Sequence, residues 1–190
     1  MLFLTDFADP GLVLPLAALV ALSLAAVGWR RDALAWSVAV AGTLAAMLVL
    51  KLAVLAHPGH LGAGMRSPSG HTAAGTVVYA GLLALLAGRR LETRTGVALL
   101  AGAAMTLLFG ATRLALGWHT LPEVLVGGAV GLAGVLALAR LAGTRRPDAP
   151  APGLALVATV ALLAAVALHG HRLHAEPTLR AIAAEIRSGG

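Results

Sequence analysis

Five residues in this chain have side chains that could bind an anion and move protons. They are Lys51, His71, Arg113, His119 and Glu123. Each lies near an end of a long apolar run, and ionisable groups at membrane depth are costly and tend to be functional. Two imidazoles and two cations beside a carboxylate would form an anion site with acid–base capacity.

The first half of this constellation lies in the segment RSPSGHTAAG. Ser67 is a suitable N-cap and Pro68 a suitable first helical residue, which would place Ser69, Gly70 and His71 in the first turn. Backbone N–H groups at a helix N-terminus lack intrahelical partners, so they bind phosphate readily. Gly70 would let the anion approach the backbone, the Ser69 hydroxyl would donate to it, and His71 could donate a proton.

The second half is Arg113, His119 and Glu123, in the stretch TRLALGWHTLPEV. His119 and Glu123 are four residues apart, so they share one face of a helix. A carboxylate on one imidazole nitrogen fixes the tautomer and leaves the other nitrogen as a nucleophile. The forked donors of Arg113 suit phosphate oxygens.

Each residue alone also has a structural interpretation. His71 could simply face lipid headgroups, and Lys51 could extend its amine to the membrane interface. Thr120 and Glu123 fit a capping box, which does not exclude a second role for the carboxylate. Arg113 could be a topology charge. Their joint occurrence at these spacings favours a phosphate site.

The composition predicts an all-α integral membrane bundle. Hydrophobic residues make up 59% of the 190 residues and charged residues only 12%, whereas charged residues are roughly a quarter of a soluble domain. We expect one membrane-embedded domain over residues 1–190. Its six apolar spans would be 11–28, 33–56, 68–88, 95–116, 120–141 and 153–169, each close to the ~20 residues that cross a bilayer.

Charge sorts the connections between these spans into two sides. Arginines follow the first, third and fifth spans: Arg30, Arg31, Arg89, Arg90, Arg94, Arg140, Arg145 and Arg146. By the positive-inside rule these connections are cytoplasmic. The site residues and both termini would then face the periplasm or exterior of the inner (plasma) membrane. Topology therefore explains the net charge of +6, and we expect membrane lipids as partners and no nucleic acid.

The termini carry weaker signals. The first residues contain no Lys or Arg, so we expect no cleaved signal peptide. Residues 170–190 favour an interfacial helix beginning near Pro177, with a frayed tail as the alternative. Several histidines fall on the outer side: His57, His60, His169, His171 and His174. A metal cluster is conceivable there, but interfacial histidines are the preferred interpretation, and we expect no metal site.

Glycines recur at helical spacing in the fifth span. Gly127 and Gly131 are four residues apart, and Gly134 follows one turn later. Small residues at this spacing let helices pack closely in lipid. We therefore expect a structural role for this face.

The chain resembles the type 2 phosphatidic acid phosphatase superfamily, which also contains the vanadium haloperoxidases. Pro68 to His71 match its Pro-Ser-Gly-His motif. Arg113, His119 and Glu123 match its Ser-Arg-x5-His-x3-Asp motif, with Thr112 in place of Ser and Glu in place of Asp. The family's first motif is degraded, since Lys51 is followed by His57-Pro58, one residue too early and without the Arg. The resemblance covers roughly residues 51–134.

The resemblance implies a metal-independent phosphatase without a cofactor. His119 would attack phosphorus and form a phosphohistidine, His71 would protonate the leaving oxygen, and Glu123 would orient His119. Phosphate oxygens would be held by Lys51, Arg113, Ser69 and the Gly70 amide. The missing arginine could be replaced by His57 or Arg66, and Arg66 is preferred because its charge is permanent.

The expected substrate is a lipid phosphate or diphosphate. The resemblance alone favours an isoprenoid diphosphate such as undecaprenyl diphosphate. Two alternatives stay open: a phosphotransferase that uses the same site, and a non-enzymatic lipid or anion transporter whose buried charges line a pathway. The sequence leaves the oligomeric state undetermined.

Overall fold

The computed structural model describes residues 1–57, 65–87, 91–142, 151–173 and 175–188. Within these residues every regular element is a helix. In chain order the elements are α1 Leu2–Asp6, α2 Pro10–Ala26, α3 Arg30–Ala56, α4 Gly70–Gly75, the π-helical segment η1 Thr76–Ala80, α5 Gly81–Ala87, α6 Leu91–Ala115, α7 Leu121–Leu141, α8 Ala151–Leu168 and α9 Ala175–Ser188.

The predicted all-α membrane bundle is confirmed. Among the described residues, four helices are long and apolar enough to cross a membrane: Arg30–Ala56, Gly70–Ala87, Glu92–Ala115 and Leu121–Leu141. Two shorter apolar helices, Pro10–Ala26 and Pro152–Leu168, correspond to the first and sixth expected spans. The third span runs continuously through α4, η1 and α5, and the π-helical turn in its middle left no signal in the sequence.

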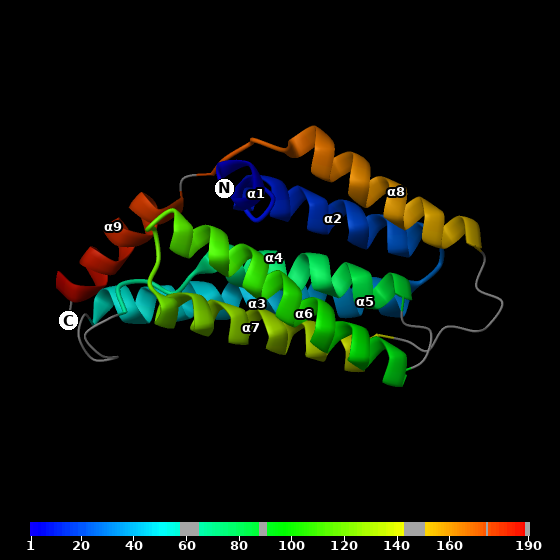
Figure 1. Ribbon diagram of the computed structural model, residues 1–190, viewed down its shortest axis with the longest axis horizontal. Helices are drawn as coiled ribbons and strands as arrows, with labels where there is room; N and C mark the ends of the chain where they lie inside the picture. The colour runs from blue at the N-terminus through cyan, green and yellow to red at the C-terminus, as the bar shows by residue number, and fades with distance from the viewer. Residues whose placement is uncertain (58–64, 88–90, 143–150, 174, 189–190) are drawn as a thin grey trace.

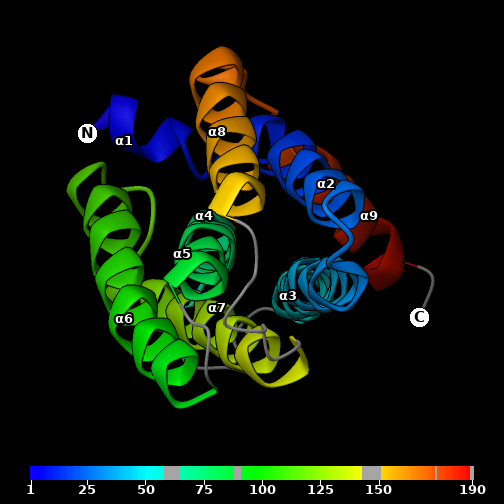
Figure 2. The same ribbon diagram turned by 90° about the vertical axis from the view of Figure 1, so that its right-hand side faces the viewer.

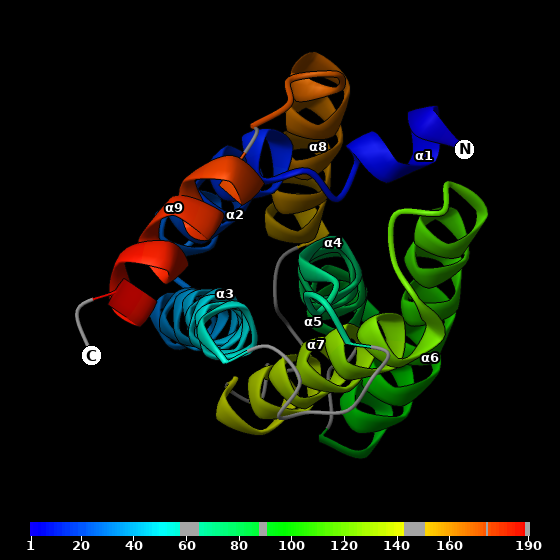
Figure 3. The same cartoon turned by 90° about the vertical axis from the view of Figure 1, so that its left-hand side faces the viewer.

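The helix formed by α4, η1 and α5 is the centre of the bundle. The end-on views show α2, α3, α6, α7 and α8 around it (Figures 2 and 3). In this span 61% of the residues are buried, whereas the most apolar parts of the other three long spans have 28–39% of their residues buried. The segment that carries the Pro-Ser-Gly-His motif therefore begins the most enclosed helix.

Successive helices alternate in direction, as the sequence predicts. Figure 1 shows that α3 and α6 end, and that α4 and α7 begin, at the same end of the bundle. Both chain termini lie toward this end. We call it the site end, because the expected site residues occur at these helix ends.

Arginines at the opposite end also stabilise the fold. Arg31 Nε donates to Leu141 O at 3.1 Å, and the buried Arg94 donates through its Nη1 to Ala142 O at 3.1 Å. The last carbonyls of a helix lack intrahelical donors and carry the negative end of the helix dipole. These two arginines therefore satisfy the C-terminus of α7, a role that the loop charge pattern alone did not reveal.

The predicted glycine face of α7 is confirmed as a packing surface. A Cβ at Gly127 would collide with Ser69 O. A Cβ at Gly131 would lie 2.7 Å from Thr76 Cβ, and one at Gly134 would collide with Thr43 Oγ1. The glycines thus allow α7 to lie against the start of the central helix and against α3.

We predict that Gly127→Ala lowers stability by about 1–3 kcal/mol, the usual cost of overpacking. The added methyl would push on the backbone at Ser69, where the central helix begins. Thermal unfolding in detergent measures the effect. The matched control is Gly42→Ala on the exposed face of α3, where a Cβ would meet nothing within 4 Å. Equal unfolding temperatures for the two variants would contradict the prediction.

Candidate active site

A cavity of about 860 Å³ opens at the site end. It is lined by seven of the eight expected site residues: Lys51, Arg66, Gly70, His71, Arg113, His119 and Glu123. These residues come from α3, the segment before α4, α4 itself, α6, the α6–α7 connection and α7. The folded chain therefore brings both imidazoles and the cations to one cavity.

Glu123 is anchored in the cavity wall by four polar contacts. Its Oε2 lies 2.9 Å from His119 Nδ1 and accepts from Thr120 N at 3.0 Å. Its Oε1 accepts from the backbone amides of Arg66 at 2.6 Å and Ser67 at 2.9 Å. The carboxylate thus closes the first turn of α7, positions the chain before α4 and fixes the His119 ring. Capping and orientation coexist in this residue.

The pair with Glu123 leaves His119 Nε2 as the ring nitrogen that can attack. An ionised carboxylate accepts the Nδ1 proton, so Nε2 carries the lone pair. Burial lowers the pKa of His119, the Glu123 hydrogen bond raises it, and the charges of Arg113 and Lys51 lower it, with a net result below the ordinary value of 6.5. His119 is therefore neutral at pH 7, which is the form a nucleophile requires.

The central helix begins two residues later than the sequence suggested. Ser69, not Ser67, is the N-cap, and its Oγ accepts from Thr72 N at 3.4 Å. Ser69 N donates to Glu123 O at 3.0 Å, which fixes Ser69 in extended backbone. Ser67 instead accepts from Lys51 Nζ at 3.2 Å. The expected cap at Ser67 and helix start at Pro68 were therefore wrong.

Ser69 lies behind the cavity wall. It is 0% exposed, and its hydroxyl is 2.8 Å from Thr72 Oγ1 in addition to its capping bond. Its expected contact with phosphate stays a prediction. Gly70, by contrast, lines the cavity. A Cβ at Gly70 would lie 3.3 Å from Lys51 Cε, so the glycine lets the lysine lie against the helix N-terminus.

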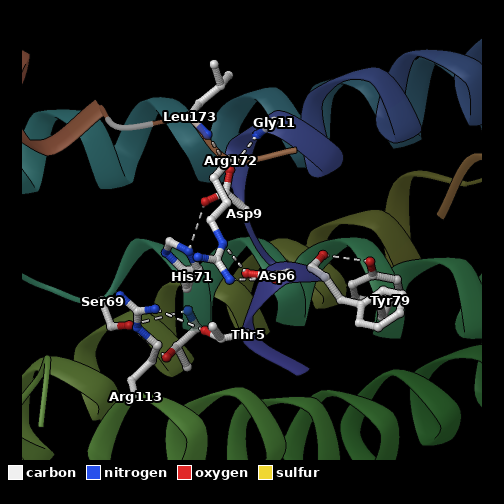
Figure 4. Close-up of polar contacts among 12 residues, drawn as sticks. Thr5, Asp6, Asp9, Gly11, Ser69, His71, Tyr79, Arg113, Arg172 and Leu173 are labelled. Carbon is white, nitrogen blue, oxygen red and sulfur yellow. Dashed lines mark hydrogen bonds and ion pairs between the residues drawn. The ribbon is translucent and has the colours of Figure 1, made fainter. Parts of the chain in front are cut away.

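Arg113 is held in place by neighbours on two sides. Its Nη1 donates to Thr5 Oγ1 at 3.0 Å, as Figure 4 shows. Its guanidinium carbon lies 4.4 Å from the centre of the Trp118 ring, a cation–π arrangement. Arg113 is only 7% exposed. The guanidinium is therefore a fixed positive group in the cavity wall.

Arg66 and His57 differ in their position relative to the cavity. Arg66 is exposed, lines the cavity and precedes the buried Ser67. His57 is exposed, its Nδ1 lies 3.3 Å from Ala53 O, and it is absent from the described lining of the cavity. Of the two candidates for the place of the missing arginine, Arg66 is therefore the one that lies beside the cavity.

The N-terminal segment supplies cavity residues that the sequence analysis missed. Asp9 Oδ2 lies 3.5 Å from His71 Nε2, and Thr5 and Asp6 also line the cavity. Asp6 forms a two-pronged ion pair with Arg172, at 2.7 and 2.8 Å (Figure 4). Only a weak signal in the sequence pointed to these residues. Asp9-Pro10 is typical of a helix start, and Asp6 and Asp9 both lie just before the first expected span.

The expected C-terminal helix is present as α9. It begins at Ala175 rather than near Pro177, packs against α3 and contributes Pro177, Leu179 and Arg180 to the cavity. It is therefore part of the site end and not only an interfacial appendage. Two of the outer histidines, His60 and His174, lie outside the described residues. Among the residues that are described, no three His, Asp or Glu side chains gather in a metal-binding group.

The fold and cavity together define a helical membrane protein with a site of histidines, a carboxylate and cations. The chain matches the PAP2 superfamily over residues 12–147, and it belongs to that superfamily. Membership of this superfamily indicates phosphatase activity on phosphate esters. No curated protein and no solved structure gave a significant match.

Proposed function

We propose that this protein is a membrane lipid phosphatase that hydrolyses a lipid phosphate or diphosphate through a phosphohistidine at His119. The observation that carries the proposal is the Glu123–His119 pair, with 2.9 Å between Oε2 and Nδ1, in the wall of a cavity that also contains His71, Lys51 and Arg113. This arrangement places a neutral, oriented imidazole in the same cavity as the cations that would bind the anion.

The reaction follows from these positions. His119 Nε2 attacks phosphorus while the bond to the leaving oxygen breaks, and His71 gives its proton to that oxygen. Lys51, Arg113 and the Gly70 amide stabilise the charge on the phosphoryl oxygens. Water then attacks the phosphohistidine, His71 takes the water's proton, and phosphate leaves with the nitrogen lone pair restored to His119.

Two features support a lipid substrate. The cavity lies at the end of membrane-spanning helices, where a headgroup would reach it. A second, apolar groove of about 280 Å³ lies beside α1, η1, α5 and α6. Leu4 and Phe7 line the groove, whereas Thr5 and Asp6 line the catalytic cavity. The N-terminal segment thus separates the cavity that holds the charged residues from a groove suited to a hydrocarbon chain.

The preferred substrate and location also remain proposals. An isoprenoid diphosphate such as undecaprenyl diphosphate is favoured by the family resemblance. We place the protein in the inner (plasma) membrane with the site end facing the periplasm or exterior, because the arginine-rich connections follow the opposite helix ends.

A panel of lipid phosphates and diphosphates, assayed with the purified protein in detergent and chelator, tests the function. We expect phosphate release that continues without divalent metal. Transfer of labelled phosphate to an acceptor other than water would identify a phosphotransferase. Absence of release from every lipid, together with lipid or anion movement in vesicles, would support the transporter alternative.

We further propose that Arg66 contributes the positive charge that the degraded first motif lacks. Arg66→Ala is expected to lower kcat/KM about 10–100-fold, since one charge-assisted phosphate contact is lost. Steady-state kinetics on the best substrate of the panel measure this. His57→Ala is the matched control and is expected to stay within about twofold of the unaltered protein. Near-normal kinetics for Arg66→Ala would reject the assignment.

A further inference from the structure

Asp9 is a buried carboxylate that the phosphatase motifs do not include. It is the N-cap of α2 and is 6% exposed. It also precedes the residues matched to the superfamily, which begin at residue 12. Its Oδ1 accepts from Gly11 N at 2.9 Å and from Leu173 N at 2.8 Å. Those two bonds fix the carboxyl group so that Oδ2 faces His71 Nε2 at 3.5 Å (Figure 4).

The charges around His71 make this contact important. A general acid must hold a proton before the reaction starts. The other charged or titratable groups that line the cavity come from nearly every element around it: Lys51, Arg66, Arg113, His119, Glu123, Asp6, Arg172 and Arg180.

Two pairs among these groups are already formed. Arg172 is paired with Asp6, and Glu123 is paired with His119. Burial and the charges of Arg113 and Lys51 act against a positive imidazole, and the contact with Asp9 acts in its favour.

We propose that Asp9 is a positioning residue that favours the protonated form of His71 and aims its ring at the leaving oxygen. This inference rests on the phosphatase function proposed above. An imidazolium has a proton on each nitrogen. Asp9 accepts from Nε2–H, and Nδ1–H is the donor that remains.

The proton balance closes over the full reaction. Nδ1 gives its proton to the leaving oxygen as the phosphorus–oxygen bond breaks, and His71 becomes a neutral imidazole whose Nε2–H stays with Asp9. The same Nδ1 then accepts the proton of the attacking water. Asp9 itself stays ionised throughout, because it gains or loses no proton in either step.

The state of Asp9 supports this role. Burial alone would raise the pKa of Asp9, but hydrogen bonds from His71 and from the amides of Leu173 and Gly11 outweigh it and hold the pKa below its ordinary value of 3.8. The carboxyl group is therefore an anion at neutral pH. Its bond to Leu173 also ties it to the chain after α8, so its direction toward His71 is fixed from two sides.

The test compares Asp9→Asn with the unaltered protein on two substrates. One is an alkyl lipid phosphate, whose leaving oxygen needs a proton, and the other is p-nitrophenyl phosphate, whose leaving group departs without one. We expect kcat to fall about 30–100-fold on the alkyl substrate, within the usual range for a general acid, and less than about threefold on the nitrophenyl substrate. The alkaline limb of the alkyl profile should move about one pH unit lower.

Two further variants show which role is lost. His71→Ala should give the same split between substrates, because it removes the acid itself. Asp6→Asn removes the nearby ion pair with Arg172 and should affect both substrates alike. If Asp9→Asn does not fold, Asp9→Ser keeps a capping oxygen without the charge and is measured instead.

Equal losses on both substrates, or an unchanged alkaline limb, would overturn the role of Asp9. No hydrolysis of either substrate by the unaltered protein would overturn the proposed phosphatase function, and the inference with it. The two failures are therefore distinguished by the unaltered protein alone.

Discussion

The His119→Ala variant is expected to lose lipid phosphate hydrolysis by a factor on the order of 10⁴ or more. Alanine removes the nitrogen that would bond to phosphorus, and no neighbouring group replaces it. His71 meets Asp9 through Nε2, and Lys51 and Arg113 are cations that bind rather than attack. Initial rates in detergent, with the variant shown to be folded by its unfolding transition, measure the loss.

His57→Ala serves as the matched control for this prediction as well. It removes an exposed imidazole whose Nδ1 lies near Ala53 O, so its rate should stay within about twofold of the unaltered protein. A His119→Ala protein that retained a tenth of the activity would contradict the nucleophile assignment.

The Glu123→Gln variant is expected to lose about 10²–10⁴-fold in kcat, as carboxylates that orient catalytic imidazoles do. Four contacts meet at Glu123: the ring of His119 and the amides of Thr120, Arg66 and Ser67. Glutamine keeps one acceptor oxygen, and its NH₂ group cannot accept from the amides. We therefore expect the variant to lose the fixed tautomer of His119 and to hold the segment before α4 less firmly. Glu185→Gln on α9 is the control and should leave kcat nearly unchanged.

The acid limb of the pH–rate profile separates orientation from simple unfolding. In the unaltered protein the pKa of His119 lies below 6.5, so the nucleophile is neutral at pH 7. Activity should therefore fall only when the pH drops through this lowered pKa. Glu123 acts to raise the pKa of His119. Its replacement by glutamine should therefore move the acid limb to still lower pH. An acid limb that stays in place or moves upward would contradict the direct contact.

The spans could be predicted because their signal is local. Apolar length and the arginines between runs determine how often the chain crosses and in which direction, and α2, α3, α6, α7 and α8 follow the expected ranges closely. The start of the central helix could not be predicted to the residue. Ser67 and Ser69 are equally good caps in isolation, and the choice depends on the bond from Ser69 N to Glu123 O across 54 residues.

The part of the site whose residues are close together in the sequence could be predicted. His119 and Glu123 are four residues apart and do meet, as predicted, but His119 precedes the N-cap Thr120 and lies just outside α7 rather than on its face. Asp9 and Thr5 were missed because their partners, His71 and Arg113, are far away in the sequence and only folding brings them together. An aspartate before a proline indicates a helix cap, and nothing in the sequence shows which side chain the carboxylate will face.

Identification of the residue that receives the phosphoryl group is the most direct test of the central claim. The protein is mixed with a lipid substrate labelled on the phosphorus, quenched within one turnover under alkaline conditions, and digested for peptide mapping. We expect label on His119, stable to alkali and released by acid, and no label in His119→Ala. Label on another residue, or rapid turnover in which no phosphate ever becomes bound to the protein, would contradict it.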